Sequence, residues 1–511
     1  MLKSNSLWAT FSHKYYSTSS SPLALNYLNG KRVEKISSSN LSNRVLLNPA
    51  TGKEIGGFFD SSKECVDRAV ENAKEAFSAW KNLSSFERGK LLRRAADLIR
   101  EDCAALAKTE VEDTGKPIWE ARLDILGCAE AIEFLGGVVP SVKGDHFALD
   151  NGNFAYTIRE PIGVVGAIGA WNYPFQMASW KAAPALACGN TVVFKPAQNT
   201  PRTAVMLAEI FTKAGIPSGV FNVVQGAAET GSLLTSHPDV KKVSFTGSVE
   251  VGSKVMSTCA ASIKHVTLEL GGKSPILIFP DAEIDDAVTG AMLGNWMTQG
   301  QVCSNGTRVY VHRSILNSFV EKLVKRTKAM KIGNPMEEDT RVGAMISQEH
   351  AERVLEYIQL AHKEGATFEY GGERVTPSDP LLQDGYYLSP CILTNCNDSM
   401  RVVKEEIFGA VMCILPFDEE EEVIRRANAT HFGLAAGVFT KDLKRAHRVV
   451  SALESGTCYI NNYNIYPVEL PFGGYKQSGI GRECGELCLQ YYSQSKSVYV
   501  EMGSPTVDAP F

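Results

Sequence analysis

Two residues of the sequence have the types and surroundings that covalent catalysis needs, a cysteine and a glutamate. Cys303 lies in the polar run Gln299-Gly-Gln-Val-Cys-Ser-Asn-Gly306, directly after an apolar helical stretch. A free thiol is largely protonated at neutral pH, so a reactive cysteine needs a helix terminus or polar donors beside it. An inert core thiol is the alternative, but this polar context favours a nucleophile.

Glu269 ends an apolar stretch in Thr267-Leu-Glu-Leu-Gly-Gly272. A carboxylate is rarely buried without a partner or a purpose, and burial raises its pKa towards the range that a general base needs. A structural glutamate held in an ion pair is the alternative. The pair Cys303 and Glu269 predicts nucleophilic catalysis followed by base-assisted hydrolysis.

Two further features are typical of nucleotide binding. The segment Phe245-Thr-Gly-Ser-Val-Glu-Val-Gly252 places a glycine turn between an apolar strand and a helix, whose free N–H groups and dipole suit a pyrophosphate. Lys195, in Phe194-Lys-Pro196, ends another apolar strand, where a lysine can reach a ribose. A plain strand–helix turn and a surface lysine are the alternatives.

The elements that would position these residues follow from hydrophobic periodicity. Steps of three and four predict helices over 61–80 and 85–110, and a third to about Leu135 after the break at Thr114-Gly-Lys-Pro117. From Ile162 onwards, short unbroken apolar runs alternate with helical stretches, which is typical of parallel strands buried on both faces. The predicted strands are 162–170, 191–194, 221–224, 243–246, 266–270 and 275–279. This part predicts an α/β fold with a doubly wound parallel sheet.

A second alternation of helices and strands follows the Gly271-Gly272 pair, which is the predicted hinge between two domains. Its predicted helices are 284–297, 315–330, 350–364 and 421–428, and its predicted strands are 308–311, 411–417, 437–440 and 457–460. Residues 497–501 alternate like an edge strand that pairs outside its own domain.

Composition excludes several classes of protein. The chain has 511 residues, of which 44% are hydrophobic and 21% charged, as in soluble globular proteins of two to four domains. A net charge of −5 leaves no basic excess for nucleic acid, and the acidic run 418–422 is interpreted as a solvated helix face. The twelve cysteines include no CxxC pair, which argues against structural zinc and for a reducing compartment. We expect no metal.

Two charge-free stretches, 161–180 and 287–307, have the length of a membrane span but contain prolines, glycines and amides that argue against one.

The N-terminal residues 1–33 differ in composition from the rest of the chain, because they contain no Asp or Glu and are rich in serine. Such a leader resembles a mitochondrial transit peptide, and a flexible terminus is the alternative. The expected compartment is therefore the cytoplasm or the mitochondrial matrix.

The sequence resembles the aldehyde dehydrogenase superfamily over nearly its whole length. The motifs that carry the resemblance are Pro161-Ile-Gly-Val, Trp171-Asn-Tyr-Pro-Phe175, Phe194-Lys-Pro, Phe245-Thr-Gly-Ser, Leu268-Glu-Leu-Gly-Gly-Lys273, Gly300-Gln-Val-Cys303, Glu405-Glu-Ile-Phe-Gly409 and Pro471-Phe-Gly-Gly-Tyr-Lys476. The resemblance implies a leader over 1–25, an NAD-binding domain over 26–143 and 160–270, a catalytic domain over 271–478, and a small β element for oligomerisation over 144–159 and 479–511. It also implies a homodimer or homotetramer.

The resemblance assigns roles to individual residues. Cys303 would attack the aldehyde carbonyl as a thiolate, Asn172 and the Cys303 N–H would stabilise the oxyanion, and Glu269 would activate water. The residues implied to bind NAD are Lys195, Gly247, Ser248, Val249, Glu250, Val251, Trp171, Glu406 and Phe408. The chain has Gln198 where many NAD-preferring members have a glutamate, so exclusion of NADP is less secure. Ala410 replaces a frequent proline, which we expect to be harmless.

Within the superfamily, the segment 460–475 resembles the members that oxidise ω-aminoaldehydes and trimethylammonio-aldehydes, as in carnitine synthesis. Aromatic faces bind quaternary ammonium groups, and Glu469 would add charge attraction. The residues implied to surround the substrate are Tyr173, Met177, Trp180, Trp296, Tyr463 and Tyr466. The alternatives are a betaine aldehyde dehydrogenase, a broad aliphatic aldehyde dehydrogenase, an acylating coenzyme A-dependent enzyme, against which Glu269 argues, and a catalytically silent relative.

Overall fold

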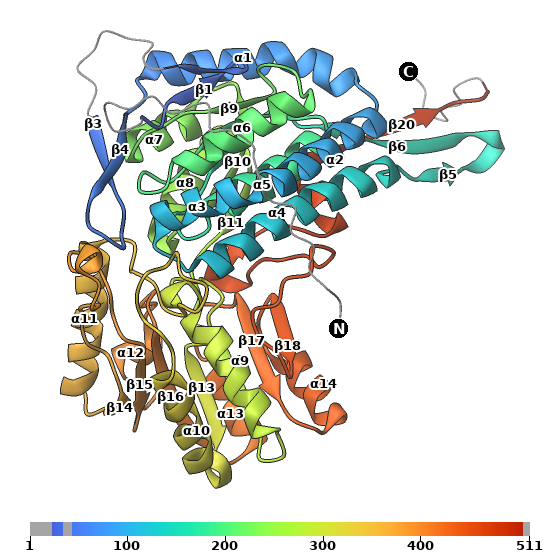
Figure 1. The fold of residues 1–511 in the computed structure, drawn as a ribbon. Helices are drawn as coiled ribbons and strands as arrows, with labels where there is room; N and C mark the ends of the chain where they lie inside the picture. Colours follow the sequence, from blue (N-terminus) through green and yellow to red (C-terminus); the bar gives the residue numbers. More distant parts are fainter. Residues whose placement is uncertain (1–22, 34–42, 504–511) are drawn as a thin grey trace, which may run out of the picture.

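Two large sheets organise the computed structural model, which describes residues 23–33 and 43–503 (Figure 1). The first sheet has eight strands in the order β19-β11-β10-β7-β8-β9-β1-β2. Its central strands β11 to β9 run parallel, and β1, β2 and β19 are antiparallel edges. The strands are β1 Asn26–Leu28, β2 Lys31–Val33, β7 Val164–Ile168, β8 Thr191–Lys195, β9 Phe221–Val223, β10 Val240–Thr246, β11 His265–Glu269 and β19 Gly479–Ile480.

Helices cover both faces of this sheet because its strands are apolar on both sides. Alternate residues of β7 show the division: Val165 and Ala167 pack with the helices of one face, and Val164 and Ile168 pack with those of the other. The first face carries α2 Ser85–Glu101, α3 Cys103–Thr114, α4 Ile118–Val138, α5 Pro174–Ala187 and α6 Arg202–Ala214. The second carries α1 Lys63–Asn82, α7 Ala228–Ser236 and α8 Val249–Ala260. The doubly wound α/β architecture is therefore present.

The second sheet has seven strands in the order β14-β15-β16-β13-β12-β17-β18, all parallel except β14. Its strands are β12 Pro275–Ile278, β13 Arg308–His312, β14 Thr367–Tyr370, β15 Cys391–Thr394, β16 Val411–Phe417, β17 Ala435–Phe439 and β18 Thr457–Ile460. Its helices are α9 Ile284–Trp296, α10 Leu316–Lys328, α11 Gln348–Lys363, α12 Arg401–Lys404, α13 Glu420–Asn428 and α14 Leu443–Ala452. Gly271 and Gly272 lie between β11 and β12, where the chain passes from one sheet to the other.

We call each large sheet with its helices a unit, the first unit being built on the eight-stranded sheet and the second on the seven-stranded sheet. A three-stranded antiparallel sheet projects from the first unit (Figure 1). It consists of β5 His146–Ala148, β6 Phe154–Pro161 and the C-terminal β20 Ser493–Val500, so β20 pairs outside the two large sheets. β19 does not belong to it, because Gly479 and Ile480 pair with β11. A separate hairpin joins β3 Asn43–Leu47 to β4 Glu54–Phe59.

The predicted helix over 85–110 is two helices in the structure. α2 ends at Glu101 and α3 begins at Cys103, with Asp102 between them at φ −93°, ψ 9°. Aspartate is a weak helix former, which fits a break that the apolar periodicity did not reveal. The break predicted at Thr114-Gly-Lys-Pro117 is present, because Gly115 caps α3 in the left-handed conformation at φ 76° and Pro117 caps α4.

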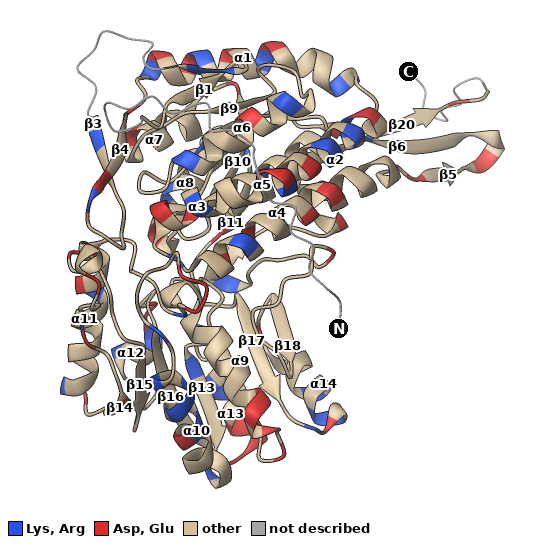
Figure 2. Cartoon of the chain, viewed as in Figure 1, with Lys and Arg blue, Asp and Glu red and all other residues tan. Residues whose placement is uncertain are grey.

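Lys and Arg positions and Asp and Glu positions are interspersed along the helices of the chain (Figure 2). The acidic run forms the start of α13, where Asp418 pairs with Arg313 at 2.9 Å and Glu420 with Arg448 at 2.6 Å. All twelve cysteines lie in the described part of the chain and are free thiols. The described residues include no group of acidic, His or Cys side chains that could hold a metal ion, and no helix long and apolar enough to cross a membrane. The predicted leader lies largely outside the described residues.

Candidate active site

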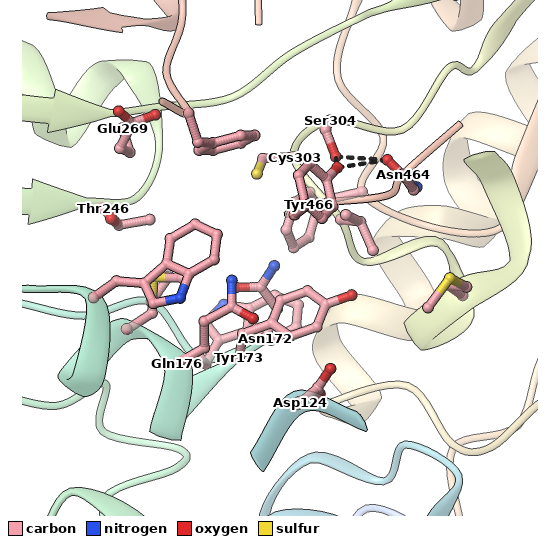
Figure 3. A pocket seen from close by; sticks show the side chains of 18 of the residues that line it. Asp124, Asn172, Tyr173, Gln176, Thr246, Glu269, Cys303, Ser304, Asn464 and Tyr466 are labelled. Atoms are coloured by element: carbon pink, nitrogen blue, oxygen red, sulfur yellow. Dashed lines mark hydrogen bonds between the residues drawn. The ribbon is translucent and has the colours of Figure 1, made fainter. Parts of the chain in front are cut away.

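The described residues enclose a pocket of about 530 Å³ between the two large sheets. The first sheet supplies the segments that follow three of its strands: residues 171–173 after β7, 246–248 at the end of β10, and Glu269 at the end of β11. In a doubly wound sheet, ligands bind beyond the carboxyl ends of the strands, because polar loops converge there. Cys303 enters from the second unit, and Figure 3 shows its sulfur pointing into the space between Glu269 and Asn172.

Cys303 follows a tight turn at the end of α9. The turn contains Thr298 and Gln299, both in the left-handed region at φ 49° and 55°, and Gly300 at φ 76°. A Cβ at Gly300 would lie 2.2 Å from the backbone of Gly409, and a Cβ at Gly272 would lie 2.5 Å from the Cys303 carbonyl oxygen. Close packing of backbone on backbone therefore fixes the position of the thiol.

The thiol is protonated in this environment. Burial raises the pKa of Cys303 to about 12, and the carboxylates of Glu406 and Glu269 add to the effect. A nucleophilic role thus requires that a neighbouring base removes the proton during attack, rather than a thiolate that exists beforehand.

Asn172 lies beside this thiol in the turn between β7 and α5. Its side-chain Nδ2 donates a hydrogen bond of 2.8 Å to the backbone oxygen of Gln301, two residues before Cys303. The amide is 4% exposed and lines the pocket, so its second N–H is oriented by the first. This is the geometry of a preorganised donor for an oxygen anion.

Glu269 is buried, and neither of its carboxyl oxygens has a hydrogen-bond partner among the described residues. Burial raises its pKa well above the usual value, and the nearby carboxylate of Glu483 raises it further, while Lys181 and Arg482 oppose the shift. Lys181 donates to Glu483 at 2.5 Å. A buried carboxyl group with free oxygens, facing a pocket that contains a thiol, is suited to move protons.

The predicted cofactor residues at the start of α8 divide into those that line the pocket and those that do not. Gly247 and Ser248 line the pocket, and the Ser248 side chain caps α8 by accepting from the N–H of Val251 at 3.3 Å. Val249, Glu250 and Val251 form the first turn of α8 and do not line the pocket; Glu250 pairs with Lys254 at 2.6 Å. Free N–H groups at this helix start suit a phosphate, so the turn fits a dinucleotide.

Lys195 lies behind the pocket rather than in its wall. Its Nζ donates to the backbone oxygens of Pro196 and Gly226, each at 2.8 Å, and burial lowers its pKa to about 8. Both acceptors are neutral carbonyls, so the ammonium group keeps a third N–H for a hydroxyl group of a ligand. Gln198, three residues on, is exposed.

Glu406, Phe408 and Trp171 all line the pocket, and Glu406 lies against the Gly271-Gly272 pair that follows Glu269. Glu406 accepts a hydrogen bond of 3.0 Å from the Gly272 N–H, and burial raises its pKa to about 7. Phe408, at φ 60°, meets Trp171 edge to face with ring centroids 5.2 Å apart. His350 completes this wall, with its Nε2 2.7 Å from the Phe408 oxygen. Sequence reasoning missed His350, because it lies on α11 and no local motif marks it.

Four of the six predicted substrate residues line the pocket: Tyr173, Met177, Trp180 and Tyr466. The structure does not place Trp296 and Tyr463 there. Both are buried in the core beneath the second sheet, since Trp296 lies on the inner face of α9 and the Tyr463 hydroxyl donates to the Ser304 oxygen at 2.9 Å. Tyr463 therefore supports the chain next to Cys303 from behind.

Phe472 is a pocket residue that sequence reasoning missed, although it belongs to the motif 471–476. Its ring lies between Trp180, at 5.8 Å, and Tyr466, at 5.3 Å, and both contacts are edge to face. Tyr466 is held by a hydrogen bond of 2.6 Å from its hydroxyl to Asn464 and by a contact with Ser304 (Figure 3). These rings form a rigid aromatic wall.

The acidic residues of the pocket also differ from expectation. Glu469 is exposed and does not line it, whereas Asp124 of α4 does. Asp124 accepts from Lys116 at 2.6 Å, and the Lys116 ammonium lies 3.9 Å from the centre of the Tyr173 ring. Sequence reasoning did not place Asp124 in the same pocket as Cys303, because the two residues lie far apart in the chain.

Comparisons with known proteins agree with this architecture. Residues 36–498 match the model of the aldehyde dehydrogenase family. The chain is 56% identical to 4-trimethylaminobutyraldehyde dehydrogenase A of Danio rerio and to 4-trimethylaminobutyraldehyde dehydrogenase of Homo sapiens, over 94% of this chain and 94% and 97% of theirs.

Two solved structures have the same fold. An aldehyde dehydrogenase of Bacillus cereus in complex with NAD+ superposes with a TM-score of 0.90 at 42% identity, over 94% of this chain and 96% of that chain. A betaine aldehyde dehydrogenase of Staphylococcus aureus, also with NAD+, gives 0.91 at 38% identity, over 96% and 97%. The family match and the relatives, together with the fold, show that this chain belongs to the aldehyde dehydrogenase family.

Proposed function

We propose that this chain oxidises 4-trimethylaminobutyraldehyde and related aminoaldehydes to the carboxylic acids, with NAD as cofactor. One observation carries the proposal: Cys303, Asn172 and Glu269 face a single pocket whose remaining wall contains the rings of Trp180 and Tyr466. The names of the 56% identical relatives support the substrate, and the NAD+ complexes of the structural neighbours support the cofactor.

The first half of the reaction forms a bond between Cys303 and the aldehyde carbon. As the Cys303 sulfur attacks, a base in the pocket takes the thiol proton and the carbonyl oxygen becomes negatively charged. The Asn172 amide and the Cys303 N–H donate to that oxygen, and one such donor is worth about 3–4 kcal/mol of barrier. Bound NAD supplies the acceptor for the hydride that leaves the former aldehyde carbon. The product on Cys303 is a thioester.

The second half of the reaction releases the acid. Glu269 accepts a proton from a water molecule, which adds to the thioester carbon; the carbon–sulfur bond then breaks and the acid leaves. The free oxygens of Glu269 support this role, because no hydrogen bond from the described part of the chain competes for them. Its raised pKa brings the carboxyl group towards the range in which it can both accept and return a proton.

The aromatic wall favours a cationic substrate. An ammonium group that contacts a ring face gains about 0.5–2 kcal/mol per ring, and a trimethylammonium group needs no hydrogen-bond acceptor. Trp180, Phe472 and Tyr466 supply three rings, and Asp124 adds a carboxyl group. A betaine aldehyde is the second candidate, because the S. aureus neighbour acts on it by name.

Steady-state kinetics with 4-trimethylaminobutanal, betaine aldehyde and hexanal, each with NAD and NADP, tests the proposal. We expect the highest kcat/KM with 4-trimethylaminobutanal and NAD. Equal values for the three aldehydes would refute the cation-binding wall and favour a broad aliphatic enzyme. Turnover that survives Cys303→Ala would show that the chemistry lies elsewhere, and no turnover with any aldehyde would favour a catalytically silent relative.

We also propose that the chain forms a homodimer or homotetramer through its three-stranded sheet. β5, β6 and β20 project from the molecule and expose Phe147, Ile158 and Tyr499, at 48%, 37% and 59% (Figure 1). Apolar side chains on a projecting sheet are typical of a surface that another subunit covers. Light scattering on wild type and on a Phe147→Asp, Tyr499→Asp variant tests this, with a fall in mass expected.

A further inference from the structure

The turn before Cys303 has an unfavourable backbone. Thr298 at φ 49°, ψ 37° and Gln299 at φ 55°, ψ 32° are consecutive left-handed residues, and neither is glycine. L-residues adopt this conformation rarely, because the Cβ crowds the following carbonyl, and a β-branched threonine is especially unfavourable. Such a conformation persists only where surrounding groups hold it in place.

Glu120 of α4 is the group that holds Thr298. Its Oε2 accepts hydrogen bonds from both the backbone N–H and the Oγ1 of Thr298, at 2.8 and 3.1 Å. The Thr298 Oγ1 also lies 3.0 Å from the hydroxyl of Tyr173, which lines the pocket. Glu120 is 1% exposed, so its carboxyl group is committed to these contacts.

The contacts of Thr298 lead directly to the catalytic residues. The backbone oxygen of Thr298 accepts from Gln301 twice, from its N–H at 3.0 Å and from its Nε2 at 3.1 Å. The backbone oxygen of Gln301 in turn accepts from Asn172 at 2.8 Å, and Cys303 follows two residues later. A shift of Thr298 would therefore move both the donor and the nucleophile.

We propose that Glu120 is a positioning residue, whose carboxylate keeps the left-handed turn at Thr298 closed and so fixes Cys303 relative to Asn172. The inference rests on the proposed role of Cys303 as nucleophile. Glu120 reaches the turn from the other unit, because α4 packs on the first sheet whereas the turn belongs to the second unit.

The charges around Glu120 make this clamp sensitive to pH. Glu120 shares its surroundings with Lys116, which precedes α4, with Asp124 of α4, and with the hydroxyls of Thr298 and, beyond it, Tyr173. Burial raises the pKa of Glu120 to about 7, and Lys116 opposes the shift. Since an ionised carboxylate is the stronger acceptor, the clamp weakens as the pH falls below about 7.

The test uses Glu120→Ala and Glu120→Gln with a neutral and a cationic aldehyde. We expect Glu120→Ala to lower kcat about ten- to a hundredfold for hexanal and for 4-trimethylaminobutanal alike, because a misplaced nucleophile affects every substrate. Glu120→Gln, which keeps the shape of the side chain, should lose less activity and should reduce the acid limb of kcat near pH 7, leaving the part that comes from Glu269 and Glu406. A rise in KM for the cationic aldehyde alone would instead make Glu120 a cation-binding residue and overturn the proposal.

Alkylation of Cys303 by iodoacetamide, followed by peptide mapping, gives a readout that needs no turnover. We expect the rate of Cys303 alkylation to differ from wild type in Glu120→Ala and to match wild type in Asp113→Asn. Asp113→Asn is the control, because it also removes a buried carboxylate, one that pairs with Arg202. Equal rates in both variants would contradict the proposal. Should turnover survive Cys303→Ala, the proposed function fails, while the alkylation rates still report the geometry of the turn.

A second variant separates positioning from general destabilisation. Glycine adopts the left-handed conformation without strain, so Thr298→Gly should reduce the need for the clamp. We expect the fall in kcat caused by Glu120→Ala to be smaller in the Thr298→Gly background than in wild type. Equal losses in the two backgrounds would show that Glu120 acts independently of the turn and would overturn the inference.

Discussion

The Asn172 side chain donates a hydrogen bond of 2.8 Å to the backbone oxygen of Gln301, and this bond joins the loop after β7 to the turn that carries Cys303. The two segments come from different sheets, so the bond aligns an amide of one unit with a thiol of the other. Its removal should affect both the oxyanion and the turn.

Asn172→Ala is expected to lower kcat about 10²- to 10³-fold, because one oxyanion donor is lost. The affinity for NAD, measured by fluorescence titration, should stay close to that of wild type, because the lost amide contacts the segment of Cys303. Asn172→Asp should be as slow, since a carboxylate repels the developing charge. A loss confined to KM would show that Asn172 only binds the substrate.

Glu269→Gln should separate the two halves of the reaction. The buried carboxyl group has no hydrogen-bond partner within residues 23–33 and 43–503, so the isosteric amide fits without disturbing a hydrogen bond there. We expect rapid formation of one NADH per active subunit, followed by a steady state slowed about 10²- to 10⁴-fold, the usual contribution of a general base. Stopped-flow absorbance at 340 nm measures both phases; a missing burst would assign Glu269 to the first half.

Phe472→Leu should weaken binding of cationic aldehydes. Phe472 contacts both Trp180 and Tyr466, so its loss removes one ring and loosens two others. We expect KM for 4-trimethylaminobutanal to rise about 2- to 30-fold, which corresponds to 0.5–2 kcal/mol, while KM for hexanal changes little. A parallel rise for both aldehydes would show that Phe472 provides only apolar packing.

Gln198→Glu should strengthen the preference for NAD. Gln198 lies exposed three residues after Lys195, where a carboxylate would repel the 2′-phosphate of NADP. We expect kcat/KM for NADP to fall about tenfold, equivalent to ~1.4 kcal/mol, without change for NAD. Gln198→Ala, which adds no charge, serves as the control and should leave the NADP/NAD ratio close to that of wild type.

Glu110→Gln should change the pH dependence of stability. Burial raises the pKa of Glu110 to about 7, and its Oε2 has no hydrogen-bond partner in the described structure. The folded state thus keeps a proton that the unfolded chain has released, so wild-type stability falls as the pH rises from about 4.5 to 7. The free energy of unfolding of the variant, relative to that of wild type, should therefore increase over that range by up to ~3 kcal/mol. Thermal melts across this pH range would detect the change as a rise in the Tm of the variant relative to wild type. Exposed Glu101→Gln should show no such gain.

Much of the fold could be predicted because its signals are local. The strands β8, β16 and β18 are unbroken apolar runs, and the glycine pair at 271–272 marks the passage between sheets. The break between α2 and α3 was missed, because it falls at a single residue, Asp102, and does not interrupt the apolar pattern.

The sequence by itself determined which residues are proposed to carry the chemistry: Cys303, Glu269 and Asn172 each lie in a local motif whose residue types the proposed reaction requires. Only the tertiary structure decided which side chains share the pocket. It brought in Phe472, His350 and Asp124 from distant segments and placed Tyr463 behind the wall. The physical reason is that a motif fixes the type of a residue, whereas the direction of a ring or carboxylate is fixed by packing between elements far apart in the chain.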